Sequence, residues 1–390
     1  MSKYPMVKLG DVFTLQMGKT PSRDNVDYWI NGTNSWVSIS DIKKDSKFIN
    51  STKESISEKA VVESKIRVVP KNTVIMSFKL SIGKTAITSC PLYTNEAIMA
   101  FIPKKGTPYD LSFLYHLFSN KNWTSGSNKA VKGTTLNKAS LYAEKIPCPE
   151  MAKQKQIATN LDKIFILIHR RKQQLAKLEE LAKSRFLEMF GDPVLNPYGF
   201  DVKNMGEVCT FYTGTGFPNV FQGKSDGDFP FYKVGDISKN VQNGFKELEY
   251  CDNYINKDVV DKIRGTIIPS GTIVFAKIGE ALKLNRRGLT IKNCLVDNNA
   301  MGVKPKEELN ISYFFQLMKD LDMEKYSAST TVPSVRKTIL ERIPILVPNL
   351  DIQNKYAEFI KQLDKSKFRI KKSLEKLELT YNALLQEYFG

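Results

Sequence analysis

Short segments of the first half of this chain recur in the same order in its second half. Matching segments lie 196 to 199 residues apart throughout. Five matches carry the pattern: residues 9–12 with 205–208, 82–83 with 278–279, 134–136 with 330–332, 144–147 with 341–344, and 187–191 with 386–390. A repeat of this period predicts that the 390 residues fold as two similar units.

Each predicted unit has a globular part followed by a helix. Short β-branched and aromatic runs (74–78 and 272–276) alternate with Gly, Pro, Asn and Asp turns, and short helices are expected near 112–118 and 312–318. Prolines end each globular part, and a stretch without Pro or Gly then runs to Gly191 or Gly390. We therefore predict an α+β fold with two similar mixed α/β domains separated by two long antiparallel helices. The expected segments are domains 1–150 and 192–348, and helices 151–191 and 349–390.

Apolar residues in both predicted helices recur at alternating intervals of four and three. This is the heptad pattern of helices that pair through interlocking side chains. A shift of 199 residues preserves it, so that Ile157 matches Tyr356 and Ala182 matches Tyr381. The predicted pairing residues are Ile157, Leu161, Ile164, Ile168, Leu175, Leu178, Ile360, Leu363, Ile370, Leu374, Leu377 and Leu384.

The alternative is that each helix packs only on its own globular domain. Residues 154–189 would span about 54 Å as a helix, which is longer than a domain of this size needs. Pro193 and Pro197 permit the chain to reverse after the first helix. An antiparallel coiled coil of the two helices is therefore the favoured interpretation.

A large excess of basic residues points to a polyanionic partner. The formal net charge is +17, and the phosphate backbone of nucleic acid is the commonest reason for such an excess on a folded chain. Residues 1–200 contain 30 Lys and Arg against 17 Asp and Glu, whereas residues 201–390 contain 28 against 24. If both halves contact DNA, the first should supply more of the salt-sensitive affinity.

The cysteines and the apolar segments bear on the cellular compartment. Five scattered cysteines form no CxxC motif or Cys/His cluster, so neither a disulfide framework nor a zinc site is expected. The sequence begins without the apolar run of a signal peptide and contains no stretch of about 18 apolar residues for a membrane span. These features predict a cytoplasmic protein without membrane contact.

Recognisable catalytic motifs are not found in the sequence, so no catalytic, cofactor-binding or metal-binding residue is expected. Phe13 and Phe78 replace the leading glycine of a phosphate-binding loop in the segments ending at Gly18-Lys19-Thr20 and Gly83-Lys84-Thr85. Asn196-Pro197-Tyr198 lacks one proline of an adenine methyltransferase motif. The pattern is that of a protein that recognises DNA without acting on it.

The ordered and duplicated motifs resemble the specificity subunit of type I restriction–modification systems over essentially the whole chain. The resemblance rests on these segments: Lys8-Leu9-Gly10-Asp11-Val12, Gly18-Lys19-Thr20-Pro21, Gly133-Thr134-Thr135, Ile146-Pro147-Cys148-Pro149 and Gln154, with Gly214–Pro218, Thr330–Pro333, Ile343-Pro344, Pro348 and Gln353 in the second copy. Lys153 and Ile352 stand where the family usually has glutamate before that glutamine.

The resemblance implies a DNA-recognition subunit that is not itself an enzyme. Each globular domain would be a target recognition domain reading one half of a split site in double-stranded DNA, and the paired helices would set the gap. Two methyltransferase subunits using S-adenosylmethionine would dock on the helices and methylate adenine, and restriction subunits with ATP-driven translocation, using ATP and Mg, would complete the complex. The chain itself would bind none of these cofactors.

Polar and basic loops are the predicted DNA-binding residues, because bases and phosphates are contacted by Lys, Arg, Asn, Ser and Thr. The richest stretch is 125–138. The candidates are Lys79, Lys84, Lys129, Lys132, Thr134, Thr135 and Asn137 in the first domain, and Lys277, Lys283, Arg286, Arg287, Thr330, Thr331, Ser334 and Arg336 in the second.

Two other functions compete with sequence-specific recognition. A non-sequence-specific nucleic-acid-binding scaffold would show a steep salt dependence without discriminating between duplexes. A self-sufficient methyltransferase or nuclease with degenerate motifs would bind its cofactor as an isolated chain.

Overall fold

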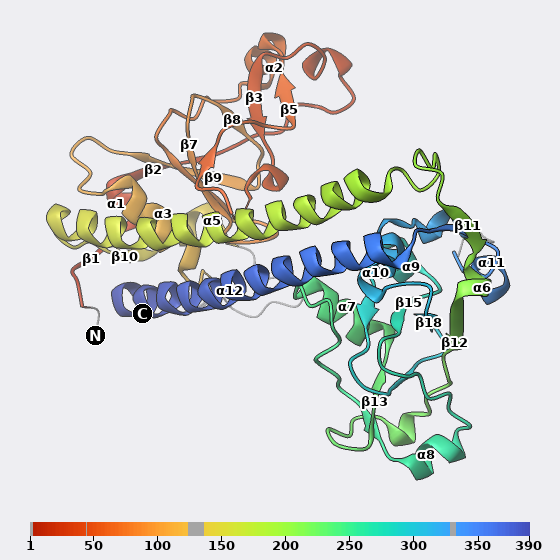
Figure 1. Ribbon diagram of the computed structural model, residues 1–390. Helices are drawn as coiled ribbons and strands as arrows, with labels where there is room; N and C mark the ends of the chain where they lie inside the picture. The colour runs from red at the N-terminus through yellow and green to blue at the C-terminus, as the bar shows by residue number, and fades with distance from the viewer. Residues whose placement is uncertain (1–2, 44, 124–135, 328–332) are drawn as a thin grey trace. The chain divides into compact units, whose positions relative to one another are not determined.

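A computed structural model describes residues 3–43, 45–123, 136–327 and 333–390. The chain forms two compact units. The first comprises Met1–Gln174 together with Ile370–Gly390, and the second comprises Leu175–Arg369. Each unit therefore contains one globular domain and a part of both long helices (Figure 1).

The first unit is a mixture of short strands and helices. In chain order its elements are β1 (Met6–Lys8), α1 (Leu9–Val12), β2 (Phe13–Met17), η1 (Val26–Tyr28), β3 (Asn34–Val37), η2 (Ile39–Asp41), β4 (Phe48–Ile49), β5 (Glu54–Ile56), α2 (Glu58–Ser64), β6 (Val74–Ser77), β7 (Thr85–Thr88), β8 (Tyr93–Thr94), β9 (Ile98–Pro103), α3 (Leu111–Asn120), α4 (Lys138–Ala143), β10 (Lys145–Pro147) and the first part of α5 (Met151–Phe190). Its sheets have the orders β2-β9-β6-β7-β4, β5-β3-β8 and β1-β10.

The second unit begins with the last part of α5. Its further elements are β11 (Asp201–Asn204), α6 (Met205–Val208), β12 (Cys209–Thr213), η3 (Asn219–Phe221), β13 (Phe229–Tyr232), α7 (Val234–Gln242), β14 (Tyr254–Ile255), α8 (Lys257–Lys262), β15 (Ile273–Ala276), α9 (Glu280–Lys283), β16 (Gly288–Leu289), β17 (Leu295–Val296), β18 (Ala300–Pro305), α10 (Ile311–Asp320), η4 (Met323–Tyr326), α11 (Lys337–Leu340), β19 (Pro344–Val347) and α12 (Leu350–Phe389), which continues into the first unit. Its sheets have the orders β12-β18-β15-β16, β14-β13-β17 and β11-β19.

The strand orders of the two units match element by element. The run β2-β9-β6-β7 corresponds to β12-β18-β15-β16, and β5-β3-β8 corresponds to β14-β13-β17. Even the parallel pairing inside the small sheet recurs, between β3 and β8 and between β13 and β17. The predicted α+β tandem repeat is therefore confirmed. The clearest difference lies after β3 and β13, where the first unit has the short η2 and the second has α7.

Alternation along the central strands divides each core into two layers. Val74 and Met76 of β6 are buried in the cluster that includes α3, whereas Ile75 between them faces a second cluster on the other side of the sheet. In β15, Ile273 and Phe275 face the cluster that includes α10, and Val274 faces the other one. The helix-side cluster of each unit is the one that also contains residues of α5 and α12.

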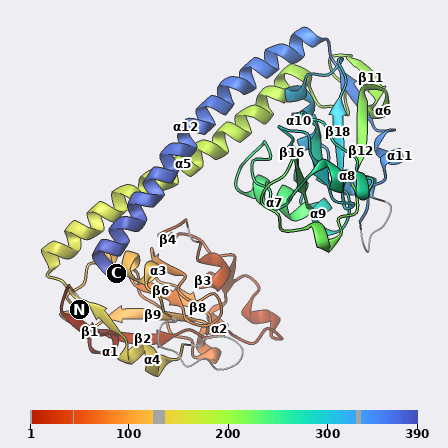
Figure 2. The same ribbon diagram turned by 90° about the horizontal axis from the view of Figure 1, so that it is seen from below.

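In each unit a part of α5 lies beside a part of α12, and the two helices run in opposite directions (Figures 1 and 2). In the first unit Asn160 contacts Tyr388, and Lys172 forms an ion pair with Glu378 at 3.2 Å. In the second unit Glu179 forms an ion pair with Lys367 at 2.7 Å. Higher numbers on α5 meet lower numbers on α12, which is antiparallel packing.

Candidate nucleic-acid interface

A buried glutamine joins the start of α5 to the first globular domain. The Gln154 amide nitrogen donates hydrogen bonds to the carbonyl oxygens of Pro108 at 2.7 Å and Pro149 at 2.8 Å. Its side-chain oxygen accepts a hydrogen bond from the backbone N–H of Asp110 at 2.9 Å. A buried amide without hydrogen-bond partners destabilises a fold, so a change in the direction of α5 that broke these contacts would be unfavourable. The contacts therefore fix the direction in which α5 leaves the domain.

The second unit repeats this arrangement at the start of α12. The Gln353 amide nitrogen donates to the carbonyl oxygens of Glu308 at 3.0 Å and Pro348 at 2.7 Å. Its oxygen accepts from the backbone N–H of Asn310 at 2.7 Å. Both glutamines are 0% exposed. The two recognition domains predicted from the sequence are thus attached to their helices by the same contacts.

A polar network in the first unit joins the globular domain to both long helices. His116 on α3 is fully buried, with its Nε2 2.7 Å from Asp162 on α5 and its Nδ1 2.8 Å from the Tyr381 hydroxyl on α12. Lys47 lies 2.7 Å from the Asp162 carboxylate, which also accepts a hydrogen bond from Ser112 at 2.5 Å. The first unit therefore ties three separate parts of the chain together through one carboxylate.

The ionisation of this network follows from its contacts. Burial opposes the charge on Asp162, but hydrogen bonds from His116, Lys47 and Ser112 outweigh burial and lower its pKa far below the ordinary value. Burial lowers the pKa of His116 more than the neighbouring carboxylate raises it. A neutral imidazole with its proton on Nε2 satisfies both contacts, since Nε2–H donates to Asp162 and Nδ1 accepts from Tyr381.

The second unit joins its domain to the helices by ion pairs and aromatic rings. Lys246, the counterpart of Lys47, lies 3.5 Å from Asp364 on α12. Glu179 on α5 lies 2.7 Å from Lys367 and 3.0 Å from Lys319. Burial raises the pKa of Glu179, but the contacts with these two lysines outweigh it and lower the pKa to about 2.

The predicted pairing residues divide into a buried group and a partly exposed group. Ile157 and Leu161 are buried in one cluster with α12, against which Leu384 packs. Ile360 and Leu363 are buried in the other cluster, against which Leu178 packs. The remaining six are partly exposed, and their pairing stays a prediction: Ile164, Ile168, Leu175, Ile370, Leu374 and Leu377. The helices pack on each other and also on the globular domains, which combines the two alternatives of the sequence analysis.

An aromatic stack at the second end of the helix pair is larger than the heptad pattern indicated. Phe186 is 1% exposed and stacks on Tyr313 of α10 at a ring-centroid distance of 5.4 Å. Phe190 and Tyr356 contact the same rings at 4.6 and 5.5 Å. These aromatic residues, rather than the aliphatic heptad positions alone, form the contact between the helices and the second domain.

In the first domain, two of the three described DNA-binding candidates lie around the turn between β6 and β7. Lys84 is exposed, and Lys79 is half-buried with its ammonium 5.3 Å from the Phe78 ring. The turn lies against the Trp123 ring at Gly83. A Cβ atom added to this glycine would be 3.3 Å from the ring. Four further candidates lie in 124–135, outside the described residues: Lys129, Lys132, Thr134 and Thr135.

Asn137 has a structural role that the sequence analysis did not predict. Its side-chain oxygen accepts a hydrogen bond from the Ser140 backbone N–H at 2.8 Å and so caps α4. Asn137 is exposed. Contact with DNA through its amide nitrogen stays a prediction.

In the second domain, the structure brings the two predicted loops together. Ile278 and Ser334 form an antiparallel bridge, and the Val335 N–H donates to the Lys277 carbonyl oxygen at 2.9 Å. Lys283 and Arg336 are exposed beside these segments. Arg286 is half-buried against the side-chain amide of Gln242. Thr330 and Thr331 lie outside the described residues.

The interpretation of Arg287 as a DNA-binding residue is wrong. Its side chain is 3% exposed, and its guanidinium donates to the carbonyl oxygen of Met318 at 3.2 Å and lies 5.0 Å from the Phe275 ring. Burial lowers its pKa to about 9. A guanidinium enclosed in the core cannot reach a phosphate, so Arg287 is a structural residue that joins β16 to α10.

Two stacked pairs in the small sheets were not predicted. Arg23 lies over the Trp29 ring at 3.6 Å and binds Glu54 with both terminal nitrogens, at 2.5 and 3.0 Å. In the second unit, Phe217 stacks on Phe231 at 3.8 Å. In both domains the loop after the first long strand therefore packs on the small sheet. The tryptophans and the Gly-Thr-Gly-Phe segment are the sequence signals that could have indicated it.

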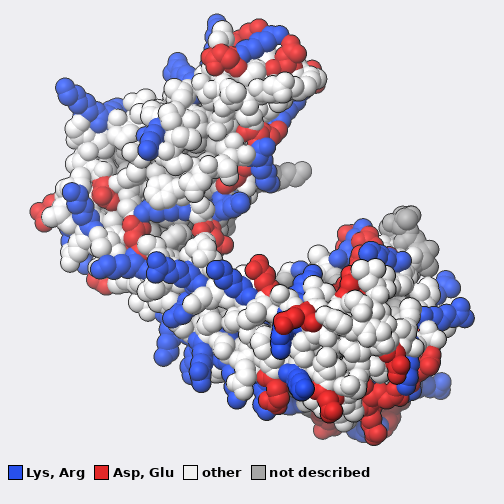
Figure 3. All heavy atoms as spheres, turned by 45° about the horizontal axis from the view of Figure 1, so that its top comes forward, with Lys and Arg blue, Asp and Glu red and all other residues white. Residues whose placement is uncertain are grey.

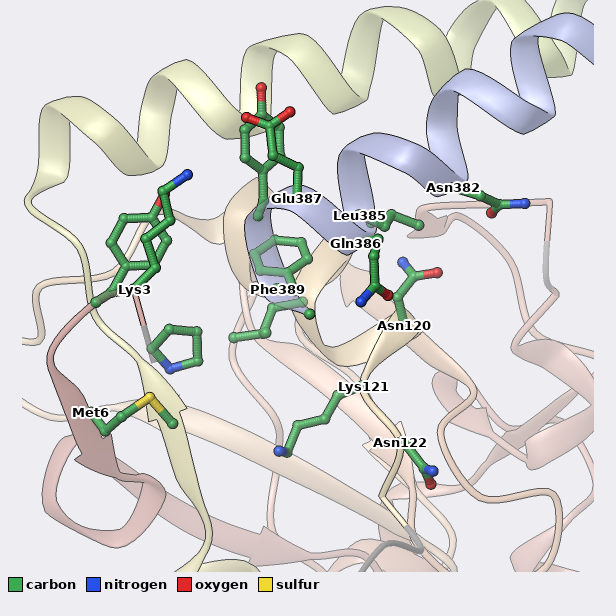
Figure 4. Close-up of a pocket in the computed structure, with 15 residues that line it drawn as sticks. Lys3, Met6, Asn120, Lys121, Asn122, Asn382, Leu385, Gln386, Glu387 and Phe389 are labelled. Atoms are coloured by element: carbon green, nitrogen blue, oxygen red, sulfur yellow. The ribbon is translucent and has the colours of Figure 1, made fainter. Parts of the chain in front are cut away.

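A hollow of about 620 Å³ lies in the first unit beside the last turn of α12 (Figure 4). Lys3, Lys121 and Glu387 contribute charged groups to its lining, and Leu385 and Phe389 contribute apolar ones. Within the described ranges, no group of three or more His, Cys, Asp and Glu side chains could bind a metal ion. Nor does any described helix have the length and apolar character to cross a membrane.

Basic side chains follow the long helices on the face shown in Figure 3. Exposed examples on α5 are Lys155, Lys163, Arg170, Lys172, Lys177 and Lys183. The charge excess found in the sequence is therefore present on the helices as well as on the loops.

A family model of the Type I restriction modification DNA specificity domain matches residues 1–180 and again residues 197–380. The chain belongs to this family. Its two specificity domains coincide with the two repeats, and each match extends into the long helix that follows its globular domain.

Specificity subunits are also its similar relatives. The MjaIX type I restriction enzyme specificity subunit of Methanocaldococcus jannaschii is 27% identical over 98% of this chain and 91% of its own length. The EcoprrI specificity subunit of Escherichia coli is 22% identical over 91% of this chain and 86% of its own length.

Solved specificity-subunit structures share the fold. The S subunit of a type I restriction–modification system from M. genitalium superposes with a TM-score of 0.59 at 14% identity, covering 100% of this chain and 96% of that one. A chain from a study of complex assembly in the type I R-M system superposes with a TM-score of 0.56 at 16% identity, covering 100% and 99%.

Proposed function

We propose that this chain selects the DNA site for a type I restriction–modification complex. Each globular domain reads one half of a bipartite sequence, and the paired helices set the spacing between the halves. The observation that carries the proposal is the presence of two specificity domains, each joined to an antiparallel helix pair by a buried glutamine. Two different readers on one support recognise an asymmetric, interrupted site.

The candidate DNA contacts are the residues of the predicted loops other than the buried Arg287. In the second domain, the bridge between Ile278 and Ser334 joins the two loops into one surface, which supports a common role for them. The residues proposed to contact DNA are Lys79, Lys84, Asn137, Lys277, Lys283, Arg286, Ser334 and Arg336, together with Lys129, Lys132, Thr134, Thr135, Thr330 and Thr331. Sequence reading by such side chains requires direct access to base edges in the major groove.

The partners are two methyltransferase subunits and the restriction subunits. Exposed apolar side chains on the long helices support docking of a protein, since isolated helix pairs rarely expose so many. Examples are Ile166, Leu167, Leu181, Leu187, Phe368 and Leu379, which are 42% to 71% exposed. The methyltransferase subunits would supply S-adenosylmethionine for adenine methylation, and the restriction subunits would supply ATP and Mg. The complex would act on DNA in the cytoplasm.

Sequencing of methylated adenine in the host genome tests the proposal. Deletion of this chain should abolish methylation at one bipartite motif, and substitution of a loop residue of one domain should change only that half of the motif. Persistence of every bipartite adenine motif after deletion would overturn the proposal. The non-sequence-specific scaffold would instead give salt-dependent binding of the purified complex with equal affinity for all duplexes.

A further inference from the structure

Matching positions of the two long helices carry side chains of different size at the helix contact. Ile157 of α5 corresponds to Tyr356 of α12, and Ala182 of α5 corresponds to Tyr381 of α12. Because the helices are antiparallel, Ile157 and Tyr381 belong to the first unit, and Tyr356 and Ala182 belong to the second. Each unit therefore combines one large and one smaller side chain.

In the second unit, the large side chain comes from the start of α12. Tyr356 is 0% exposed, and its hydroxyl donates to the carbonyl oxygen of Ala182 at 3.3 Å. Ala182 is itself 3% exposed in the cluster that contains Phe186. A larger side chain at position 182 would overlap with these rings.

In the first unit, the large side chain comes from the end of α12. Tyr381 packs against the cluster that buries Ile157, and its ring lies 6.4 Å from that of Phe165. Its hydroxyl is the partner of the buried His116 Nδ1 at 2.8 Å. Tyr381 therefore fills space against the cluster that contains Ile157 and satisfies a buried imidazole.

We propose that these two pairs, together with His116, make α5 select α12 of the same chain over α5 of a second copy. In a pair of two α5 helices, Ala182 of one copy would take the place of Tyr381, which leaves empty volume and removes the partner of His116. In a pair of two α12 helices, Tyr381 of one copy would take the place of Ala182. Its ring would then overlap with Tyr356, because the space around the buried Ala182 is already filled. Each self-pairing is disfavoured by about a hundredfold or more. The inference concerns helix pairing and does not depend on DNA recognition.

An exchange of the two side chains in the full-length chain tests this. With Ala182→Tyr and Tyr381→Ala together, pairing inside one copy suffers both defects, whereas pairing between two copies restores both matched contacts. When tagged and untagged full-length copies are co-expressed, the tagged copy of the exchanged variant should retain at least about tenfold more untagged copy than wild type does.

Single substitutions should change the retention of the untagged copy by a smaller amount or not at all. Tyr381→Ala alone leaves one defect in either mode of pairing, so its retention should fall between that of wild type and the exchanged variant. Lys376→Ala, at an exposed position on the same helix, should match wild type. The proposal is wrong if the exchanged variant and Tyr381→Ala both retain untagged chain at the wild-type level.

Discussion

The first unit attaches the end of α12 through polar contacts, whereas the second attaches its start through aromatic rings. His116, Asp162 and Tyr381 meet in the first unit, whereas Phe186 and Tyr356 meet in the second. Hydrogen bonds depend on direction and protonation, but ring packing depends mainly on volume. The two ends of α12 are therefore held by contacts that respond differently to mutation and to pH.

The shared contacts show what both units require. Gln154 and Gln353 make the same three hydrogen bonds, and Lys47 and Lys246 both reach an aspartate of a long helix. These contacts join a globular domain to a helix and recur after about 199 residues. The units differ in the segment after β3 and β13, and also in the side chains through which the other helix of each pair is bound.

Loss of the aromatic stack should give the largest effect, and it should be confined to the second unit. Phe186→Ala removes a ring that is 1% exposed and should lower the free energy of unfolding by about 3–5 kcal/mol. Denaturant unfolding measures this, and hydrogen exchange should show lost protection in α10 and not in α3. Phe368→Ala, at a 68% exposed position, should change stability by less than about 0.5 kcal/mol. Equal loss of protection in α3 and α10 would contradict the expectation that the aromatic stack stabilises only the second unit.

Removal of the central carboxylate should come next and affect the first unit. Asp162→Asn leaves Lys47, which is 14% exposed, without its charged partner and should cost about 2–3 kcal/mol. Asp364→Asn is the matched control, because that carboxylate is 45% exposed and lies 3.5 Å from Lys246. Its effect should stay below about 1 kcal/mol. Similar losses in both variants, measured by denaturant unfolding, would show that the polar network is not special to the first unit.

The two glutamines should have equal effects in the two units. Gln154→Leu and Gln353→Leu each leave buried backbone groups without partners and should cost about 1–3 kcal/mol. Hydrogen exchange should report the loss at α3 for the first variant and at α10 for the second. A substitution that weakens only one unit would contradict the equivalence of the contacts.

Acidification should give the smallest difference in stability between the two units. The folded-state pKa of His116 is lowered, so below about pH 6.5 the unfolded chain binds a proton that the folded chain does not, and stability falls as pH falls. The contribution of Glu179, whose folded-state pKa is lowered to about 2, is lost only between about pH 4 and 2. From pH 7 to 5, the first unit should therefore weaken and the second should not. Hydrogen exchange of α3 and α10, corrected for intrinsic rates, measures the difference, and His116→Gln should abolish it.

Much of the fold could be predicted from the sequence because its signals are periodic. The repeat of 196 to 199 residues and the heptad spacing indicated two similar units and two long helices, which the structure has as Met151–Phe190 and Leu350–Phe389. The runs at 74–78 and 272–276 became β6 and β15. Prolines and glycines marked the ends of these elements because they are excluded from helix interiors.

The side-chain contacts could not be predicted in the same way. Arg287 has the composition of a DNA-binding residue, and only the packing of β16 against α10 shows that it is buried. His116 and Tyr381 are 265 residues apart, and no local pattern relates them. The glutamines were among the repeated motifs of the sequence, since both follow a proline by five residues and match across the repeat. Their hydrogen bonds to Pro108 and Glu308 required coordinates.

The discontinuous first unit has a consequence for biosynthesis. The second unit is one continuous segment, Leu175–Arg369, whereas the first needs Ile370–Gly390 in addition to Met1–Gln174. At about 5–20 residues per second, the ribosome needs tens of seconds to reach Tyr381 after it has made His116. During this time α3 and α5 expose the apolar surface that Leu384 and Leu385 later cover. The half of the protein that is translated first is therefore the half that finishes folding last.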